Sequence, residues 1–224
     1  MYKTVVFDLD GTLLDTLADL AAAVNYALVK NGLPTRTIDE VRGFVGNGAA
    51  VLMQLAAGEE RSFEKQLLQD FRDYYGAHCA ENTKPYDGVC EVLRTLNARG
   101  VKTAVLSNKP DFAVKDLSQR YFPNLLTEAA GENEAAGIRK KPAPEGLFAI
   151  MDKLGSNRSE TLYVGDSEVD ILTAKNAGVD CLSVTWALKT NAFYSKTARQ
   201  SSSVPPPRSC VFFRKGRGRK PRNF

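Results

Sequence analysis

Strand-like and helix-like segments alternate along most of this chain, and the alternation limits its possible folds more than any other feature. The first segment, at 4–10, is an apolar, β-branched run that ends abruptly at Gly11. Such a run is typical of a parallel strand buried on both faces. We therefore predict an α/β fold with a doubly wound parallel sheet. Its later helices are expected at 87–99, 110–121, 144–154 and 168–177, and its later strands at 101–107, 125–129, 161–165 and 180–184.

A purely helical block interrupts this alternation directly after the first strand. Apolar residues recur at helical spacing in 16–31, and similar patterns follow at 37–56 and 63–79. Because the block separates the first strand from the rest of the sheet, we predict that it is an inserted subdomain. The predicted division is a core of 1–15 and 85–186, a helical insert of 16–84 and a tail of 187–224.

The net charge conceals two parts of opposite sign. The 224 residues include 30 Lys+Arg and 26 Asp+Glu, which gives a formal net charge of +4. A basic chain suggests an anionic partner such as nucleic acid. However, ten of the basic residues and none of the acidic ones follow Trp186, so the preceding part is acidic. The basic character therefore belongs to the tail alone.

The tail, 187–224, combines Ser, Pro and Gly with a dense basic run at 214–222. This composition buries too little apolar surface to offset the entropy lost on ordering. We expect a disordered or divergent terminus that does not supply a closing strand, and hence an exposed sheet edge. A basic segment of this kind either binds nucleic acid or another anionic surface, or has no selected role. Both interpretations stay open.

Several classes of protein are disfavoured by patterns that the sequence lacks. No apolar run approaches the ~18–20 residues of a membrane span, so we expect no membrane partner. Without a secretory signal or a CxxC pair among its four cysteines, the chain is expected to be cytoplasmic. The one histidine, His78, disfavours a zinc site and a serine triad. Pro85 stands where a cysteine phosphatase loop beginning at Cys79 needs an arginine.

Polar side chains gather where the predicted strands end. Asp8 and Asp10 end the first strand, Ser107 and Asn108 the second, and Asp166 follows the fourth. Ligands of open parallel sheets bind at the carboxyl ends of strands, so we expect one site there. Asp8 and Asp10 are two positions apart and repel each other unless a proton or cation lies between them. Together with Asp166 they favour Mg²⁺, which prefers oxygen ligands.

The alternative is that these acids only stabilise turns and helix starts, as Asp often does. For Asp8 and Asp10 alone, the two interpretations are about equally plausible. Three strand ends bring polar residues to one edge of the sheet, and this favours the interpretation that the acids form a functional site.

Four motifs in order resemble those of the haloacid dehalogenase-like phosphatases. They are Asp8-x-Asp10-Gly11-Thr12, Ser107-Asn108, Lys141-Pro142 and the segment 165–170, Gly-Asp-Ser-Glu-Val-Asp. The resemblance covers about residues 3–186. Within this superfamily the chain is similar to the bacterial phosphoglycolate phosphatases, and that likeness lies in 7–13, 19–24, 46–48, 107–110 and 165–167.

The resemblance implies a role for each acid of the motifs. Asp8 would be the nucleophile that attacks phosphorus, forming an aspartyl-phosphate. Asp10 would protonate the leaving alkoxide and later activate water. Mg²⁺ would be held by the Asp8 carboxylate, the Asp10 backbone carbonyl and Asp166. Asp170, one helical turn beyond Asp166, would support the metal from nearby or through water.

The resemblance also implies which groups bind the phosphate. The Ser107 hydroxyl and the backbone N–H of Asn108 would donate to its oxygens. Lys141 would offset the charge of the transferred group, because the family places its lysine directly before the proline. Its neighbours Arg139 and Lys140 fit solvated surface charges better. Lys109 would either contact a substrate carboxylate or be solvated, and the sequence favours neither.

The helical insert resembles the small cap that closes over the active site in this family and excludes water. Its Gly46-Asn47-Gly48 segment would approach the substrate, since two glycines permit close backbone contact. A plain helix–helix turn is nearly as good an explanation.

The expected function is Mg²⁺-dependent hydrolysis of a small phosphorylated metabolite, 2-phosphoglycolate first, by a monomer or homodimer. One alternative keeps the chemistry but moves the phosphate within a sugar, as the family's phosphomutases do. The other is a non-catalytic protein that binds nucleic acid through its tail.

Overall fold

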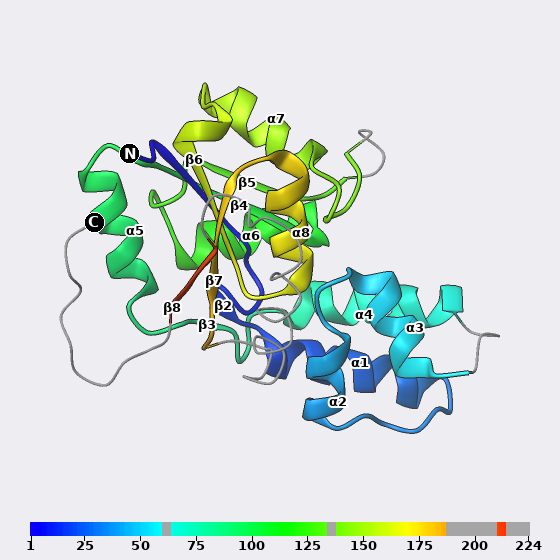
Figure 1. Cartoon of the computed structure of the whole chain (residues 1–224). Helices are drawn as coiled ribbons and strands as arrows, with labels where there is room; N and C mark the ends of the chain where they lie inside the picture. The colour runs from blue at the N-terminus through cyan, green and yellow to red at the C-terminus, as the bar shows by residue number, and fades with distance from the viewer. Residues whose placement is uncertain (60–63, 134–137, 187–209, 214–224) are drawn as a thin grey trace.

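A computed structural model describes residues 1–59, 64–133, 138–186 and 210–213 of the chain. Its main sheet has six strands, and all of the neighbouring strands that pair are parallel. Figure 1 shows this sheet with helices packed on both of its faces. The predicted fold class is therefore confirmed. The strand order is β5 (Glu128–Glu132), β4 (Lys102–Pro110), β1 (Thr4–Phe7), β6 (Thr161–Gly165), β7 (Asp180–Val184) and β8 (Cys210–Phe213).

Strand β1 lies in the middle of the sheet, and alternate residues of it face two separate cores. Val6 packs with α7 (Glu145–Leu154) and α8 (Glu168–Ala177) on one face. Val5 and Phe7 pack with α5 (Val89–Ala98) and α6 (Asp111–Tyr121) on the other. Burial on both sides explains why the first strand is a continuous apolar run rather than an alternating one.

The helical insert leaves the core and returns to it through two short paired strands. Leu14 of β2 (Leu14–Asp15) pairs antiparallel with Pro85 of β3 (Lys84–Pro85). The division of the chain into core and insert domains stays a prediction. In Figure 1 the helices between these strands lie together beside the sheet. They are α1 (Leu17–Lys30), α2 (Ile38–Phe44), α3 (Ala49–Ala57) and α4 (Glu64–His78).

Asp19, in the first turn of α1, anchors the return of the chain to the core. Its buried carboxylate accepts hydrogen bonds from the backbone N–H groups of Asn82 and Thr83 at 2.9–3.0 Å. The side chains of the same two residues donate at 2.8 Å. Burial alone would raise the pKa of Asp19, but these hydrogen bonds hold it below its usual value. One carboxylate thus satisfies both backbone donors at the junction.

Replacing Asp19 by Ala should destabilise the fold by about 3 kcal/mol, because it leaves buried N–H groups without an acceptor. Urea unfolding measures this free energy. The control is Asp39→Ala at an exposed position of α2, where the expected loss is at most about 0.5 kcal/mol. Similar losses for the two variants would refute the anchoring role.

One segment of the tail, 187–224, differs from the prediction that the tail supplies no closing strand. Cys210–Phe213 form β8, which pairs parallel with β7 at the edge of the sheet. The prediction that the tail supplies no closing strand is therefore wrong for these four residues. The predictions for 187–209 and 214–224 concern residues outside the described ranges. None of the helices in the described ranges combines the length and apolar character that a membrane span requires.

Candidate active site

A pocket opens where the carboxyl ends of β1, β4 and β6 meet the helical insert. The chain order of the sheet reverses at β1, so this is the edge at which open parallel sheets bind ligands. Most of the predicted residues line the pocket. Those from the core are Asp8, Asp10, Ser107, Asn108, Lys141 and Asp166, and those from the insert are Gly46 and Gly48.

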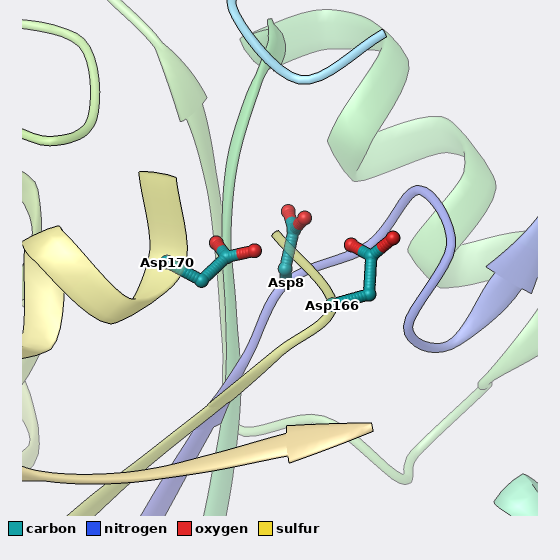
Figure 2. A group of neighbouring side chains, drawn as sticks. All are labelled: Asp8, Asp166 and Asp170. Carbon is teal, nitrogen blue, oxygen red and sulfur yellow. The ribbon is translucent and has the colours of Figure 1, made fainter. Parts of the chain in front are cut away.

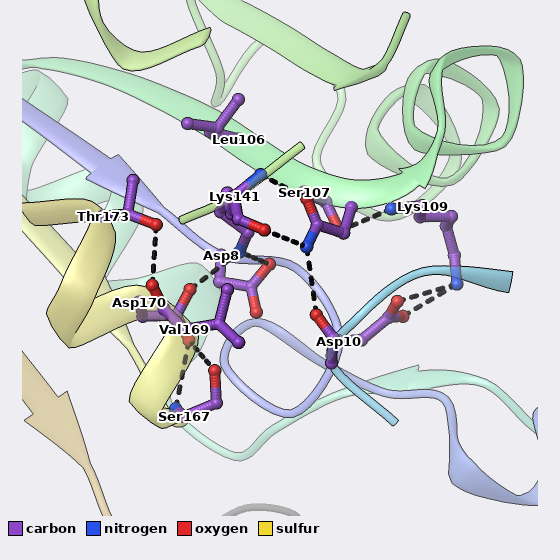
Figure 3. A network of polar contacts seen from close by, with 12 residues as sticks. Asp8, Asp10, Leu106, Ser107, Lys109, Lys141, Ser167, Val169, Asp170 and Thr173 are labelled. Carbon is purple, nitrogen blue, oxygen red and sulfur yellow. Dashed lines mark hydrogen bonds and ion pairs between the residues drawn. The ribbon is translucent and has the colours of Figure 1, made fainter. Parts of the chain in front are cut away.

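A tight loop after β1 separates the side chains of the two N-terminal acids. The Asp8 N–H still donates to Val164 of β6 at 2.8 Å, which continues the strand pairing. The chain then turns at Gly11, whose φ of +82° lies in the left-handed region that glycine tolerates. Asp8 consequently faces one cluster of side chains, and Asp10 faces another (Figure 3).

Asp8, Asp166 and Asp170 form a buried carboxylate cluster, with ligand oxygens that all lie within 4.8 Å of one another. Figure 2 shows Asp8 between Asp170 on α8 and Asp166 at the end of β6. Asp170 also caps α8, because the N–H and hydroxyl of Ser167 donate to it at 3.0 and 2.6 Å. A Cβ atom at Gly165 would lie 2.3 Å from Asp170, so the glycine leaves room for this carboxylate.

Lys141 enters this cluster from the neighbouring loop and is itself buried. Its Nζ lies 2.9 Å from Asp8 Oδ1 and 2.7 Å from Asp170 Oδ1 (Figure 3). The Tyr163 hydroxyl is 3.1 Å from the same Nζ. Of the three adjacent basic residues, Lys141 is the one that extends into the cluster. Lys140 pairs with Glu132 and Arg139 with Glu145.

The charges of the cluster do not balance. Burial raises the pKa of Asp8 to about 7, with a contribution from Asp170, although Lys141 acts to lower it. Burial alone would lower the pKa of Lys141, but Asp170 and Asp8 hold it well above its usual value. The cluster therefore holds three carboxylates and one ammonium group that stays charged and contacts two of them. A divalent cation with oxygen ligands fits the remaining negative charge.

Asn108 fixes the loop that carries Lys141. Its side-chain Oδ1 accepts from the Lys141 N–H at 2.8 Å, and its Nδ2 donates to the Lys141 carbonyl at 3.1 Å. The same Nδ2 is 3.1 Å from the carbonyl of Gly46 in the insert. The prediction for Asn108 concerned its backbone N–H, so this clamp between core and insert was missed. Ser107 lies beside it and lines the pocket.

Asp10 belongs to a second polar group. Both of its carboxylate oxygens lie 2.9 Å from Lys109 Nζ, and the Thr16 hydroxyl donates to it at 2.8 Å. Lys109 is buried, and its Nζ lies 4.6 Å from the ring centroid of Tyr75 on α4. The interpretation of Lys109 as a solvated charge is therefore wrong. The one sequence feature that indicated a role for Lys109 in the pocket was its position next to Ser107-Asn108.

The three residues of the Gly46-Asn47-Gly48 segment do not all line the pocket. Gly46 and Gly48 line the pocket, whereas the Asn47 side chain is exposed. Gly48 has a φ of +84° and precedes α3, and a Cβ there would lie 3.3 Å from the Asn108 carbonyl oxygen. The insert backbone thus approaches the strand ends closely at Gly48.

The comparisons with known proteins agree with this geometry. Residues 5–184 match the family described as haloacid dehalogenase-like hydrolase. The chain belongs to that family, and the resemblance predicted from its motifs is confirmed. It is an enzyme of the phosphatase type, and the curated proteins that it resembles include several named phosphoglycolate phosphatase.

The relative from Pseudomonas putida is 38% identical over 192 residues, which cover 82% of this chain and 70% of that protein. The relative from Vibrio parahaemolyticus is 36% identical over 193 residues, covering 82% and 84%. A crystal structure from Lactobacillus delbrueckii, provisionally named phosphoglycolate phosphatase, superposes with a TM-score of 0.83 at 33% identity. That match covers 95% of this chain and 94% of the other.

Proposed function

We propose that this enzyme hydrolyses 2-phosphoglycolate with Mg²⁺, through an aspartyl-phosphate on Asp8. The observation that carries the proposal is the buried Asp8 carboxylate, held between Lys141 and two further carboxylates at the floor of the pocket. The names of the similar phosphatases support the choice of substrate.

The Asp8 carboxylate attacks phosphorus, and the bond between phosphorus and the bridging oxygen breaks. Asp10 gives its proton to the departing alkoxide, which leaves as glycolate. Asp10 then takes a proton from the water that hydrolyses the aspartyl-phosphate, so that inorganic phosphate is released and Asp8 is restored. Thr16 and Lys109 hold the Asp10 carboxylate in place for both transfers.

Lys141 and Ser107 bind the transferred group. The Lys141 ammonium, beside Asp8 and buried, offsets the charge that gathers on phosphorus oxygens. The Ser107 hydroxyl and the Asn108 N–H donate to the same oxygens. The side-chain clamp from Asn108 fixes the backbone of Lys141 and so the start of its side chain.

The carboxylates of Asp8 and Asp166, with the backbone carbonyl of Asp10, would hold the Mg²⁺ ion. Asp170 lies in the same cluster and would bind it from nearby or through water. When bound, the metal supplies charge neutralisation between the nucleophile and an incoming phosphate dianion.

The helical insert serves as a cap in this proposal. Apolar side chains from α1, α3 and α4 line the pocket opposite the strand ends, and they exclude water from the reacting groups. These side chains are Leu20, Leu52 and Phe71.

We expect Mg²⁺ to raise the melting temperature, and the rise to grow from about pH 5 to about pH 8. Because the pKa of Asp8 is raised to about 7, the folded protein binds a proton below that pH which the unfolded chain does not. The stability of the metal-free protein therefore falls as pH rises through this window. Mg²⁺ offsets the loss at the higher pH, where a proton no longer competes with it for the Asp8 carboxylate. Thermal unfolding with and without Mg²⁺ measures the effect.

The variant Asp166→Asn should lose most of the Mg²⁺-dependent rise. The control Asp39→Asn, at an exposed position, should keep it. An equal rise at both pH values, or in Asp166→Asn, would exclude this cluster as the metal site.

Product analysis tests the proposed reaction. Incubation of the full chain with 2-phosphoglycolate and Mg²⁺ should release inorganic phosphate and glycolate in equal amounts. Conversion of a sugar phosphate into its isomer without phosphate release would instead support the phosphomutase alternative. Failure to release phosphate from 2-phosphoglycolate or any other phosphate monoester would reject the proposed function.

A further inference from the structure

The pocket has a second polar end that the phosphate chemistry does not use fully. Among the described residues that line the pocket, Lys109 and Lys141 are the only cations, and Lys141 is held by Asp8 and Asp170. Lys109 lies at the side that faces the helical insert, between the strand end and the ring of Tyr75.

Lys109 is a charged donor at this end of the pocket. Its ammonium group has three N–H donors, and the two carboxylate oxygens of Asp10 and the Tyr75 hydroxyl lie around it. Burial alone would lower the pKa of Lys109, but Asp10 holds it above the usual value, so the group stays charged. A buried cation attracts an anion most strongly once the anion has lost its water shell.

The hydroxyl of Tyr75 provides a second donor at this place. It is buried, lines the pocket and interacts with the Lys109 ammonium group, which cannot accept a hydrogen bond. The O–H of Tyr75 therefore has no acceptor in the described part of the chain. Burial raises the pKa of Tyr75, so the phenol stays neutral and can donate. A buried O–H without an acceptor is costly, and a ligand acceptor in the pocket would remove that cost.

We propose that Lys109 and Tyr75 bind the carboxylate of the substrate and so select phosphorylated short carboxylic acids. This inference rests on the proposed phosphatase function. Asp10 protonates the bridging oxygen, and in 2-phosphoglycolate the carboxyl carbon is separated from that oxygen by one methylene group. A cation that touches Asp10 therefore lies beside the position that the carboxylate takes. The apolar side chains Leu20, Leu52 and Phe71 accommodate the methylene group.

The test compares two substrates in each variant. We measure kcat/KM for 2-phosphoglycolate and for ethyl phosphate, which lacks the carboxylate, and take their ratio. Lys109→Met should lower this ratio about 30-fold relative to wild type, and Tyr75→Phe about tenfold. Lys109→Arg, which keeps the charge, should restore part of the ratio. The control Lys115→Met, at an exposed position of α6, should leave it unchanged.

The ratio separates carboxylate binding from a role through Asp10 alone. If Lys109 only positions Asp10, both substrates lose activity in Lys109→Met. Ethyl phosphate then loses at least as much, because its alkoxide is the poorer leaving group and depends more on the proton from Asp10. An unchanged or higher ratio in Lys109→Met would overturn the inference and leave the phosphatase function intact.

Tyr75→Phe gives an independent answer if Lys109→Met fails to fold, since it removes only one oxygen. An unchanged ratio in Tyr75→Phe would remove Tyr75 from the proposed subsite. A wild-type enzyme that does not prefer 2-phosphoglycolate over ethyl phosphate would also overturn the inference. In that case its activity on ethyl phosphate would still support the phosphatase function.

Discussion

Replacing Asp8 by Asn should lower phosphate release from 2-phosphoglycolate by at least about 10⁴-fold. The amide has no anionic oxygen to attack phosphorus, and the reaction would lose its covalent step. The variant should nevertheless fold, because it removes one negative charge from a cluster that holds three carboxylates and one ammonium group. Steady-state phosphate release measures the activity, and thermal unfolding without Mg²⁺ measures the stability.

The two readouts for Asp8→Asn should move in different directions. Without metal and near pH 8, its melting temperature should equal or exceed that of the wild type, since the burial of a charge is avoided. Loss of activity together with loss of folding would make Asp8 a structural residue. Activity within about tenfold of the wild type would exclude it as the nucleophile.

Replacing Lys141 by Met should lower phosphate release about 10³-fold. The variant loses the ammonium group that lies 2.9 Å from Asp8 and 2.7 Å from Asp170. The buried carboxylates then repel each other without compensation, so the metal-free variant should also be less stable than the wild type. Mg²⁺ should restore much of that stability but little of the activity.

Lys140→Met is the matched control, because it changes the preceding residue in the same way. Lys140 pairs with Glu132 outside the carboxylate cluster. Its replacement should change phosphate release by less than about threefold. Equal losses in the two variants would mean that general positive charge at this loop matters rather than the contact with Asp8.

The sheet could be predicted because its strands carry their own signals. The run at 4–10 is apolar on both faces, and the later strands alternate with helices of ordinary length. The predicted strand at 101–107 extends to Pro110 in β4. The added residues include Asn108 and Lys109, polar groups that a rule based on hydrophobic runs excludes although both are buried.

Position at a strand end predicted that Asp8 and Asp166 would meet, but it also placed the Asp10 carboxylate with them, which instead contacts Lys109. Asp8 and Asp166 come together because β1 and β6 are neighbours in the sheet. The place of Asp170 in the cluster depended on Gly165, whose missing side chain leaves the space that the Asp170 carboxylate occupies. That packing relation has no local signal, so the role of Asp170 near the metal could be expected only from the family resemblance.

The pair of Asp10 and Lys109 could not be predicted, since the two residues are 99 positions apart. Nothing in the local sequence distinguishes a buried lysine from a solvated one at the end of a strand. The strand β8 was missed for a different reason. Four apolar residues, Cys210–Phe213, were judged by the basic composition around them, although they satisfy the pattern of a short strand.

A covalent phosphate at Asp8 is the central step of the proposed mechanism. Acid quenching of the 224-residue chain during turnover of 2-phosphoglycolate with Mg²⁺, followed by mass spectrometry of its peptides, tests this claim. We predict one added phosphoryl group on the peptide that contains Asp8, present during turnover and lost once the substrate is consumed. Phosphate release with that peptide unmodified at every time of quenching, and with equal rates for wild type and Asp8→Asn, would contradict the account.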